Sequence, residues 1–294
     1  MKKRQETTVL KAWREEAHRL VNAGVENGSF EVEVMLRSIL GWERTRFFME
    51  MDRPLDEETL HTLKDWVEKR KLGVPLQYLT GEQEFYGRSF CVGPQVLIPR
   101  PDTETLVEAV LQKAQAIWGE QPITVADIGT GSGILAVTLA AERPDWSLIA
   151  VDRSPSALAM AKRNAERHGV SSHIAFQEGD WLLPLIREGI HADLIISNPP
   201  YIPTPEVERL DREVREHEPR IALDGGVDGL TPYREILKQA PSVLNKPGVV
   251  AFEIGWDQGS AVTQMGSSLP GAAESTVLTD LAGRDRVVVM RVNR

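Results

Sequence analysis

The sequence predicts a chain of two parts: a small helical domain, followed by a larger α/β domain whose mostly parallel sheet is covered by helices on both faces. In the first eighty residues, apolar side chains such as Leu10, Trp13 and Ala17 recur at helical spacing. After Pro101, strand-like and helix-like segments alternate as far as the C-terminus, as in a parallel sheet with helical connections. We therefore expect an N-terminal helical domain over residues 1–82, a β-hairpin or linker over residues 83–101 and the α/β domain over residues 102–294.

The helical domain carries local signals for separate helices. Val34, Met35 and Ile39 begin a second apolar face, and Asp56 is placed to cap a third helix. The Gly-Val-Pro sequence at residues 73–75 then ends that helix. Apolar stripes of this kind indicate helices that pack against one another rather than a ligand site.

Residues 84–100 have a different character. Residues 85–92 and residues 95–98 predict two short strands, with Gly93 and Pro94 between them. They fit either a hairpin or an extended linker between the two domains.

The α/β domain alternates regularly. The expected strands are residues 124–128, 148–152, 173–177, 193–197, 249–254 and 286–292, and the clearest helices are residues 134–142 and 155–168. Such alternation predicts helices on both faces of one sheet.

Charge is distributed unevenly along the chain. Residues 1–71 carry 14 basic and 14 acidic side chains, so the rest of the chain accounts for the whole net charge of −9. A protein that binds nucleic acid non-specifically needs a basic face, and the composition indicates none. The single cysteine, Cys91, excludes a disulfide within the chain and fits a reducing compartment, and no apolar run is long enough to span a bilayer. We expect a cytoplasmic protein without a metal, a membrane partner or a nucleic-acid partner.

A glycine-rich loop follows the first strand of the α/β domain. It consists of Gly129, Thr130, Gly131, Ser132 and Gly133. Glycine lets the backbone turn sharply and approach a ligand closely, and the free N–H groups at the start of the next helix favour an anionic or polar group. The spacing G-x-G-x-G differs from the G-x-G-x-x-G of a dinucleotide site.

Acidic side chains lie close to this loop in the expected sheet. Asp152 ends the next strand, where its carboxylate can accept hydrogen bonds from two ribose hydroxyls. The alternative role for Asp152 is to cap the following helix, although Ser154 before Pro155 can do this. Asp127 either braces the loop or meets an amino group of the ligand.

Asp180 and Trp181 follow a third strand, where they either contact an adenine ring or belong to the core. In order and spacing, the loop, Asp152 and this pair resemble the class I S-adenosylmethionine-dependent methyltransferases. The resemblance implies a Rossmann-like sheet, S-adenosyl-L-methionine as the cofactor and S-adenosyl-L-homocysteine as its product.

The strand at residues 193–197 ends in Asn198, Pro199, Pro200 and Tyr201, which we call the Asn-Pro-Pro-Tyr segment. Proline has no N–H, so this rim offers carbonyl acceptors and few donors, and the Asn198 side chain adds an acceptor oxygen. Two convergent acceptors suit an incoming –NH2 group, and Tyr201 offers a flat face to a planar substrate. Because an amide nitrogen is a weak nucleophile, we expect the segment to act mainly by positioning. The alternative is a turn that only ends the strand.

Further stretches resemble the release-factor glutamine methyltransferases (the HemK/PrmC family) over nearly the full chain. They are residues 75–81, 85–87, 97–104, 127–133, 180–181, 198–201, 218–223 and 228–230. The resemblance implies methylation of the glutamine in the Gly-Gly-Gln tip of class 1 peptide chain release factors. It also implies that the N-terminal helical domain helps to dock that protein substrate.

The resemblance also implies the site residues. It implies a cofactor site of Gly129, Thr130, Gly131, Ser132, Gly133, Asp152, Trp181 and Asn198, and a substrate site of Asn198, Pro199, Pro200 and Tyr201, in which Asn198, Pro199 and Tyr201 are the expected catalytic residues. Arg100, Asp102 and Glu104 either shape the substrate entrance or have structural roles, with Asp102 or Thr103 as a helix cap and Arg100 in an ion pair.

Two other functions stay open on the sequence. A nucleic-acid amino methyltransferase faces the same geometric problem at the exocyclic amine of adenine or guanine, but the acidic α/β domain disfavours phosphate contacts. A non-catalytic binding protein with the cofactor fold is expected to have lost the glycine-rich loop, Asp152 or the Asn-Pro-Pro-Tyr segment, and this chain has all three.

Overall fold

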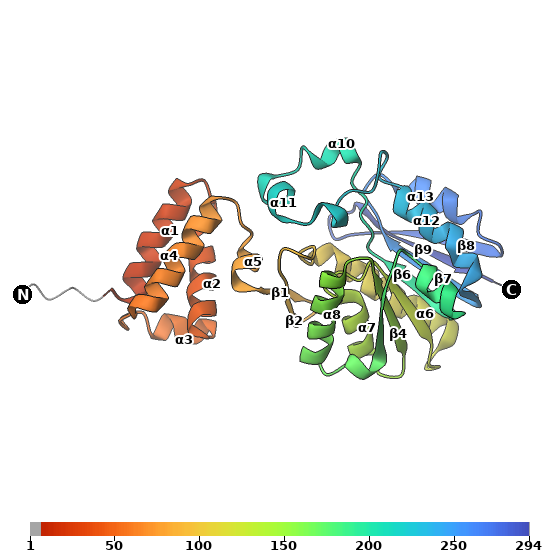
Figure 1. Cartoon of the computed structure of the whole chain (residues 1–294), viewed down its shortest axis with the longest axis horizontal. Coiled ribbons are helices and arrows are strands. Elements are labelled where there is room, and N and C mark those ends of the chain that lie inside the picture. The colour runs from red at the N-terminus through yellow and green to blue at the C-terminus, as the bar shows by residue number, and fades with distance from the viewer. Residues whose placement is uncertain (1–6, 294) are drawn as a thin grey trace, which may run out of the picture. The chain divides into compact units, whose positions relative to one another are not determined.

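The computed structural model describes residues 7–293 and divides the chain into two compact units (Figure 1). The helical unit comprises Met1–Gly81 with Asp211–His217, and the sheet unit comprises Glu82–Leu210 with Glu218–Arg294. The division after Gly81 nearly coincides with the boundary expected after residue 82, whereas no local signal indicates the transfer of residues 211–217 to the helical unit. Across residues 7–293, no helix combines the length and the apolar composition needed to cross a membrane.

The helical unit contains α1 (Val9–Asn22), α2 (Gly28–Leu40), α3 (Arg44–Met49), α4 (Glu57–Lys71), α5 (Leu76–Thr80) and α11 (Arg212–His217). Asp56 caps α4 as predicted, because its Oδ1 accepts a hydrogen bond of 2.7 Å from the Thr59 N–H. Leu20, Leu36 and Leu63 are fully buried in one core between α1, α2 and α4. The apolar stripes are therefore helix-packing surfaces, as expected.

Arg70 explains why residues 211–217 belong to the helical unit. Its Nε lies 2.6 Å from Glu31 Oε2 on α2, and its Nη1 lies 2.8 Å from Glu213 Oε2 on α11. The Arg70 side chain is only 11% exposed, so these ion pairs are screened less than surface pairs. One guanidinium thus links α4 to α2 and α11.

The hairpin lies earlier in the chain than expected. Its strands are β1 (Glu82–Phe85) and β2 (Arg88–Cys91), which pair antiparallel. Tyr86 and Gly87 form the turn with φ of 50° and 69°, the positive values that a two-residue hairpin needs. The prediction of two strands around Gly93 and Pro94 was therefore wrong. Positive φ is unusual for tyrosine, and the Tyr86 N–H is held by Glu104 Oε1 at 2.8 Å, a tertiary contact that the local sequence does not reveal.

One seven-stranded sheet forms the centre of the sheet unit. Its strands in spatial order are β5 (Ile174–Glu178), β4 (Ser147–Asp152), β3 (Thr124–Ile128), β6 (Ala192–Ser197), β7 (Leu244–Glu253), β9 (Asp285–Val292) and β8 (Ala272–Thr279). The first five are parallel, and β9 pairs antiparallel with both β7 and β8. The predicted fold class is confirmed. The edge strand β8 was not predicted, because most of its residues are only partly buried or exposed and its apolar pattern is weak.

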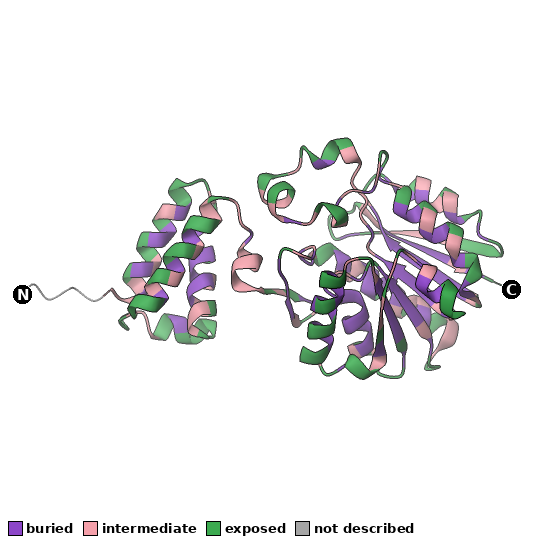
Figure 2. Cartoon of the chain, in the orientation of Figure 1, coloured by how far each residue is buried: buried purple, intermediate pink, exposed green. Residues whose placement is uncertain are grey.

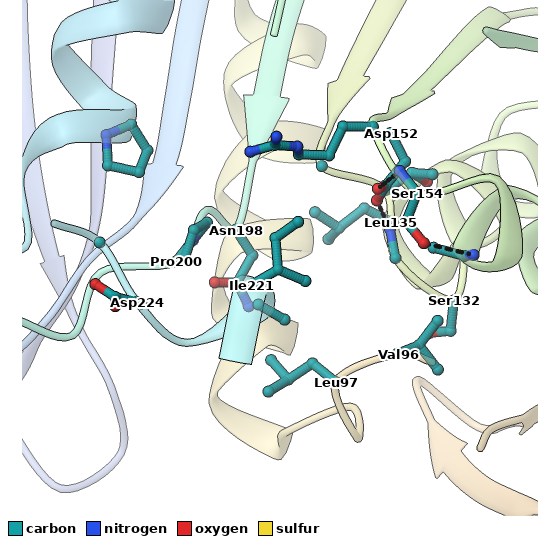
Figure 3. A pocket seen from close by; sticks show the side chains of 18 of the residues that line it. Val96, Leu97, Ser132, Leu135, Asp152, Ser154, Asn198, Pro200, Ile221 and Asp224 are labelled. Carbon is teal, nitrogen blue, oxygen red and sulfur yellow. Dashed lines mark hydrogen bonds between the residues drawn. The ribbon is translucent and has the colours of Figure 1, made fainter. Parts of the chain in front are cut away.

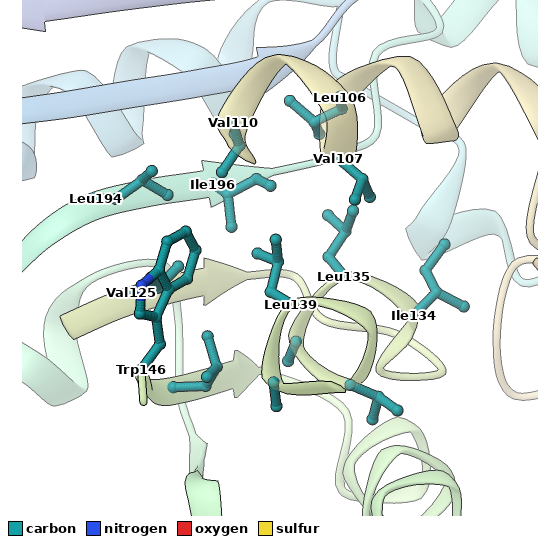
Figure 4. Close-up of a cluster of buried hydrophobic side chains, with 14 of the residues drawn as sticks. Leu106, Val107, Val110, Val125, Ile134, Leu135, Leu139, Trp146, Leu194 and Ile196 are labelled. Atoms are coloured by element: carbon teal, nitrogen blue, oxygen red, sulfur yellow. The ribbon is translucent and has the colours of Figure 1, made fainter. Parts of the chain in front are cut away.

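Helices cover both faces of this sheet. One face carries α6 (Glu104–Trp118), α7 (Ile134–Glu142) and α8 (Pro155–Arg167), the other carries α9 (Leu183–Glu188), α12 (Thr231–Gln239) and α13 (Gly259–Gly266), and α10 (Thr204–Val207) is a single turn after β6. Alternate residues of β6 serve the two cores. Leu194 and Ile196 pack with α6 and α7 (Figure 4). Ile195 belongs to the opposite core. The central strands are buried along most of their length, as Figure 2 shows.

Candidate functional site

The parallel strands bring the predicted site residues together at one edge of the sheet. β3 leads into the glycine-rich loop, β4 ends at Asp152, β5 precedes Asp180 and Trp181, and β6 leads into the Asn-Pro-Pro-Tyr segment. A cavity of about 510 Å³ lies at this edge, within the usual size range of small-molecule sites. Figure 3 shows this cavity between Asn198 on one side and Asp152 on the other. Sites at the carboxyl ends of parallel strands are the rule in open α/β sheets.

Most of the predicted cofactor residues line the cavity, namely Gly129, Thr130, Gly131, Ser132, Asp152, Trp181 and Asn198. Gly133 is not among the lining residues of the described chain. Its φ is 84°, and a Cβ placed on it would lie 3.0 Å from the Ala161 Cβ on α8. The requirement for glycine at this position therefore comes both from its positive φ and from the close approach of Ala161 on α8.

Gly131 has different surroundings. Its φ is 56°, and a Cβ placed on it would meet nothing nearer than the Gly129 carbonyl oxygen at 4.0 Å. Because Gly129 and Gly131 line the cavity, the loop presents its backbone to the cavity without side chains. A ligand can therefore approach the main chain here without meeting a side chain.

Asp127 braces the loop from beneath the sheet edge. Its Oδ2 accepts hydrogen bonds from Thr130 Oγ1 at 2.6 Å and from the Ala136 N–H at 3.2 Å. The carboxyl group is completely buried, which raises the pKa of Asp127 to about 7. Asp127 is absent from the cavity wall among the residues described, so of its two predicted roles this geometry favours bracing.

Asp152 connects the loop to the next strand. Its Oδ2 accepts a hydrogen bond of 2.9 Å from the Gly131 N–H, and its Oδ1 accepts one of 2.9 Å from the Ser154 N–H. Burial raises the pKa of this carboxyl, and the backbone donors oppose that change. Ser154 caps α8 as predicted, since its Oγ accepts from the Ala157 N–H at 3.3 Å. Asp152 is therefore not needed as the helix cap and faces the cavity.

Trp181 occupies a constrained position on the cavity wall. Its φ is 52°, which is a rare backbone conformation for a bulky residue. The side chain is half-buried, lines the cavity and also packs against the core of the α12 and α13 face, while its contact with an adenine ring stays a prediction. Asp180 lies 3.4 Å from Arg153 Nε, and both residues line the cavity. Strained backbone of this kind concentrates at functional sites.

The Asn-Pro-Pro-Tyr segment faces the cavity through Asn198 and Pro200. Asn198 Nδ2 donates a hydrogen bond of 3.2 Å to Oγ1 of Thr103, which is fully buried. This contact leaves Asn198 Oδ1 as an acceptor. Pro199 and Tyr201 are not part of the cavity wall in the described chain, and the Tyr201 hydroxyl donates to Glu253 Oε1 at 3.3 Å. The stacking of Tyr201 on a substrate stays a prediction.

The stretch before α6 is held by tertiary contacts. Neither Asp102 nor Thr103 caps α6 with its side chain, so the cap prediction was wrong. Asp102 instead lies 3.2 Å from Arg286, and the Thr103 hydroxyl is the partner of Asn198. Arg100 forms an ion pair with the buried carboxylate of Glu218, one of its two predicted roles, and it also lines the cavity, so a role at the substrate entrance stays a prediction.

Three buried polar residues contact the segment: Thr103, Glu253 and Gln258. The sequence predicts only a helix cap for Thr103 and no role for the other two. Glu253 follows four apolar residues at the end of the buried strand β7, and this abrupt change from apolar to charged was the available signal. Gln258 gives no local signal, because its role depends on a partner 57 positions away.

Comparison with known proteins places these features in one family. The model described as the PrmC N-terminal domain matches residues 11–81, and the model described as the methyltransferase small domain matches residues 102–211. The chain is 41% identical over 288 residues to the release factor glutamine methyltransferase of Bacillus subtilis, with 98% of this chain and 99% of that protein covered. It is 44% identical over 273 residues to the protein of the same name from Geobacter sulfurreducens, with 93% of each covered.

A solved methyltransferase from Pyrococcus furiosus has a similar fold, with a TM-score of 0.51, 16% identity and coverage of 71% of this chain and 91% of that one. The resemblance seen in the sequence is thus confirmed over nearly the whole chain. The protein uses S-adenosylmethionine as its cofactor, and it belongs to the family of release factor glutamine methyltransferases.

Proposed function

We propose that this protein transfers a methyl group from S-adenosylmethionine to the side-chain amide nitrogen of the glutamine in the Gly-Gly-Gln motif of class 1 peptide chain release factors. The observation that carries the proposal is the orientation of Asn198. Because its Nδ2 is engaged by Thr103, its Oδ1 is available to accept a hydrogen bond from a substrate –NH2 group. Pro200, which lines the cavity, adds a carbonyl oxygen, and neither Pro199 nor Pro200 has an N–H donor that competes with these acceptors.

The cavity fits the cofactor in size and in chemistry. Gly129 and Gly131 leave open space beside the backbone, Asp152 offers carboxylate oxygens to hydroxyl groups, and Trp181 offers an aromatic face. Together with Thr130, Ser132 and Asn198, these are the residues that we expect to hold it. When bound, S-adenosylmethionine supplies a methyl group on a positively charged sulfur, which makes that carbon electrophilic.

The residues of the chain act on the substrate amide mainly by positioning it. Acceptors that hold both N–H bonds fix the nitrogen in one orientation, and alignment of this kind supplies on the order of 7–11 kcal/mol in favourable cases. The same acceptors stabilise positive charge that develops on the nitrogen. A primary amide with two N–H bonds uses these acceptors fully.

A protein substrate needs a docking surface, and the helical unit is the candidate. We propose that the N-terminal helical domain, residues 1–82, helps to dock the release factor, and that the reaction takes place in the cytoplasm, where the single cysteine Cys91 stays reduced. The acidic balance of the rest of the chain agrees with a protein substrate rather than a nucleic acid.

Methyl transfer from labelled S-adenosylmethionine to a purified release factor tests the proposal, with the modified peptide located by mass spectrometry. We expect one methyl group on the Gly-Gly-Gln glutamine, and none on a control release factor in which that glutamine is replaced by alanine. Label in RNA or DNA with none in the release factor contradicts the proposal and favours the nucleic-acid amino methyltransferase.

A further inference from the structure

The turn after β7 lies against the Asn-Pro-Pro-Tyr segment and holds Tyr201 in two ways. At one end of the turn, Glu253 Oε1 accepts the hydrogen bond of 3.3 Å from the Tyr201 hydroxyl. At the other end, Gln258 Nε2 donates a hydrogen bond of 2.9 Å to the Tyr201 carbonyl oxygen. The side chain and the main chain of Tyr201 are therefore both fixed by residues 253–258.

This turn is itself rigidly built. Gln258 Oε1 accepts from the Gly255 N–H at 2.9 Å and lies 3.1 Å from the hydroxyl of Tyr233. The same hydroxyl lies 3.0 Å from the Glu253 carbonyl oxygen. Tyr233 is fully buried and Gln258 almost so, which keeps water from competing for these contacts. The turn is thus held by contacts within the chain.

Glu253 is expected to destabilise the folded state. It is 1% exposed, and its Oε2 has no hydrogen-bond partner in the described part of the chain. Burial raises the pKa of Glu253 to about 7, although the Thr103 hydroxyl and Arg286 act in the opposite direction. A buried carboxyl with an unpaired oxygen destabilises a protein. Its presence therefore needs an explanation other than stability.

The contacts of Thr103 supply that explanation. Its hydroxyl accepts from Asn198 Nδ2 and also interacts favourably with the Glu253 carboxylate. Glu253 thus reaches one end of the segment directly, at Tyr201, and the other end through Thr103. Neither Glu253 nor Gln258 lines the cavity among the described residues, so neither is placed to touch the reacting atoms.

We propose that Glu253 and Gln258 are positioning residues for methyl transfer, which hold the Asn-Pro-Pro-Tyr segment so that its acceptors stay aligned with the substrate amide. The inference rests on the proposed function only in that the segment binds an amide. It extends the site from the cavity wall to a buried layer of residues behind it.

The kinetic test uses Glu253→Gln and Gln258→Ala in the full-length protein. Loss of alignment affects the transition state more than the bound ground state, so we expect kcat to fall roughly ten- to hundred-fold, while KM for the release factor and affinity for S-adenosylhomocysteine change by less than about three-fold. In the double variant Tyr201→Phe with Glu253→Gln, we expect no greater loss than in the more impaired single variant, because the two groups act together.

Asp193→Asn is the matched control. Asp193 lies near the start of β6, at the opposite end from the segment, and accepts hydrogen bonds from the Thr124 N–H at 2.8 Å and from Asn245 Nδ2 at 2.9 Å. It is also a carboxylate with two protein donors, but it has no contact with the segment. We expect its kcat to match that of the wild type, with thermal unfolding recorded for every variant.

Hydrogen exchange gives a second measurement that does not require turnover. In the complex with S-adenosylhomocysteine, we expect the peptide that contains Ile202, whose N–H donates to Leu223, to exchange faster in Glu253→Gln and Gln258→Ala than in the wild type or in Asp193→Asn. Unchanged kcat and unchanged exchange in both variants, with an active wild type, overturn the inference alone. An inactive wild type in which the variants still exchange faster overturns the proposed function instead and supports the positioning contacts.

Discussion

The glycine-rich loop and the Asn-Pro-Pro-Tyr segment both follow buried parallel strands, but their geometry has different origins. The loop takes its shape from its own residues, since Gly129, Gly131 and Gly133 all have positive φ. Its braces, Asp127 and Asp152, end or nearly end the two adjacent strands β3 and β4. The glycine-rich loop and both of its braces are therefore built from one βαβ unit, β3–α7–β4.

The segment depends on residues far away in the chain. Asn198 is held by Thr103, 95 positions earlier, and Tyr201 by Glu253 and Gln258, 52 and 57 positions later. The two prolines remove two of the four backbone N–H donors of the segment, so partners elsewhere in the chain contribute much of what fixes it. Nearby residues therefore determine the conformation of the glycine-rich loop, whereas tertiary contacts determine the conformation of the Asn-Pro-Pro-Tyr segment.

The largest expected effect comes from removing the acceptor itself. Asn198→Ala should lower kcat by roughly 10²- to 10³-fold, the cost typical of a lost transition-state hydrogen bond, with a smaller change in S-adenosylhomocysteine affinity. Steady-state kinetics and calorimetry measure the two quantities. A kcat within a few-fold of the wild type contradicts the role that we give to Asn198.

Thr103→Val tests the distant support of Asn198, although Thr103 itself also lines the cavity. The variant keeps the side-chain shape but removes the hydroxyl that accepts from Asn198, so we expect about a ten-fold fall in kcat. Thr103→Ser should restore most of the activity, because it returns the hydroxyl. If Thr103→Val and Thr103→Ser have the same kcat, Asn198 does not need this hydrogen bond, and the claim that distant residues fix the segment is contradicted.

Alanine substitutions at three glycines distinguish two effects on the cofactor side: blocking the approach of the ligand and straining the backbone. Gly131→Ala, Gly133→Ala and Gly169→Ala each force a side chain into the left-handed region, at about 1 kcal/mol of stability. Gly169 has open space around it and is not part of the cavity wall in the described chain, so it is the control for strain alone.

Of these three variants, only Gly131→Ala should weaken S-adenosylhomocysteine binding, by roughly ten-fold, because its Cβ enters space that the ligand needs. Gly133→Ala should lose additional stability from the contact with Ala161. Calorimetry and chemical denaturation separate the two losses. Equal affinities in all three variants remove the loop from the cofactor site.

A separate effect, on stability rather than on turnover, concerns Asp127 and pH. Its pKa is raised from 3.8 to about 7 by burial, so the folded state holds a proton that the unfolded state has lost between these pH values. Stability from this group is therefore present at low pH and declines as the pH rises from about 4 to about 7, by at most about 1.4 kcal/mol per pH unit. Asp127→Asn should reduce this decline. It should not abolish it, because the pKa of Glu253 is also raised to about 7 and Glu253 contributes a decline of its own. Urea unfolding of the ligand-free wild type and of Asp127→Asn at pH 5 and at pH 7.5 measures the difference. If the free energy of unfolding depends on pH in the same way in both proteins, the raised pKa of Asp127 is contradicted.

Much of the fold was predictable from the sequence because its signals are local. Strand β3 and helix α7 have the predicted limits, and Asp56 and Ser154 cap their helices as expected. The hairpin turn and the edge strand β8 were not predictable in the same way. The Tyr86 turn depends on Glu104, and every residue of β8 is exposed or only partly buried, so neither leaves a clear local pattern.

The sequence by itself determined which chemical groups stand at the ends of the strands: glycine backbone after β3, a carboxylate at the end of β4 and the Asn-Pro-Pro-Tyr segment after β6. Strand periodicity and turn chemistry act over a few residues, so a linear sequence reveals them. Only the tertiary structure decided which way Asn198 presents its amide and that Glu253 and Gln258 stand behind Tyr201. Hydrogen bonds between residues fifty to a hundred positions apart form when strands and helices pack, and no local pattern encodes their partners.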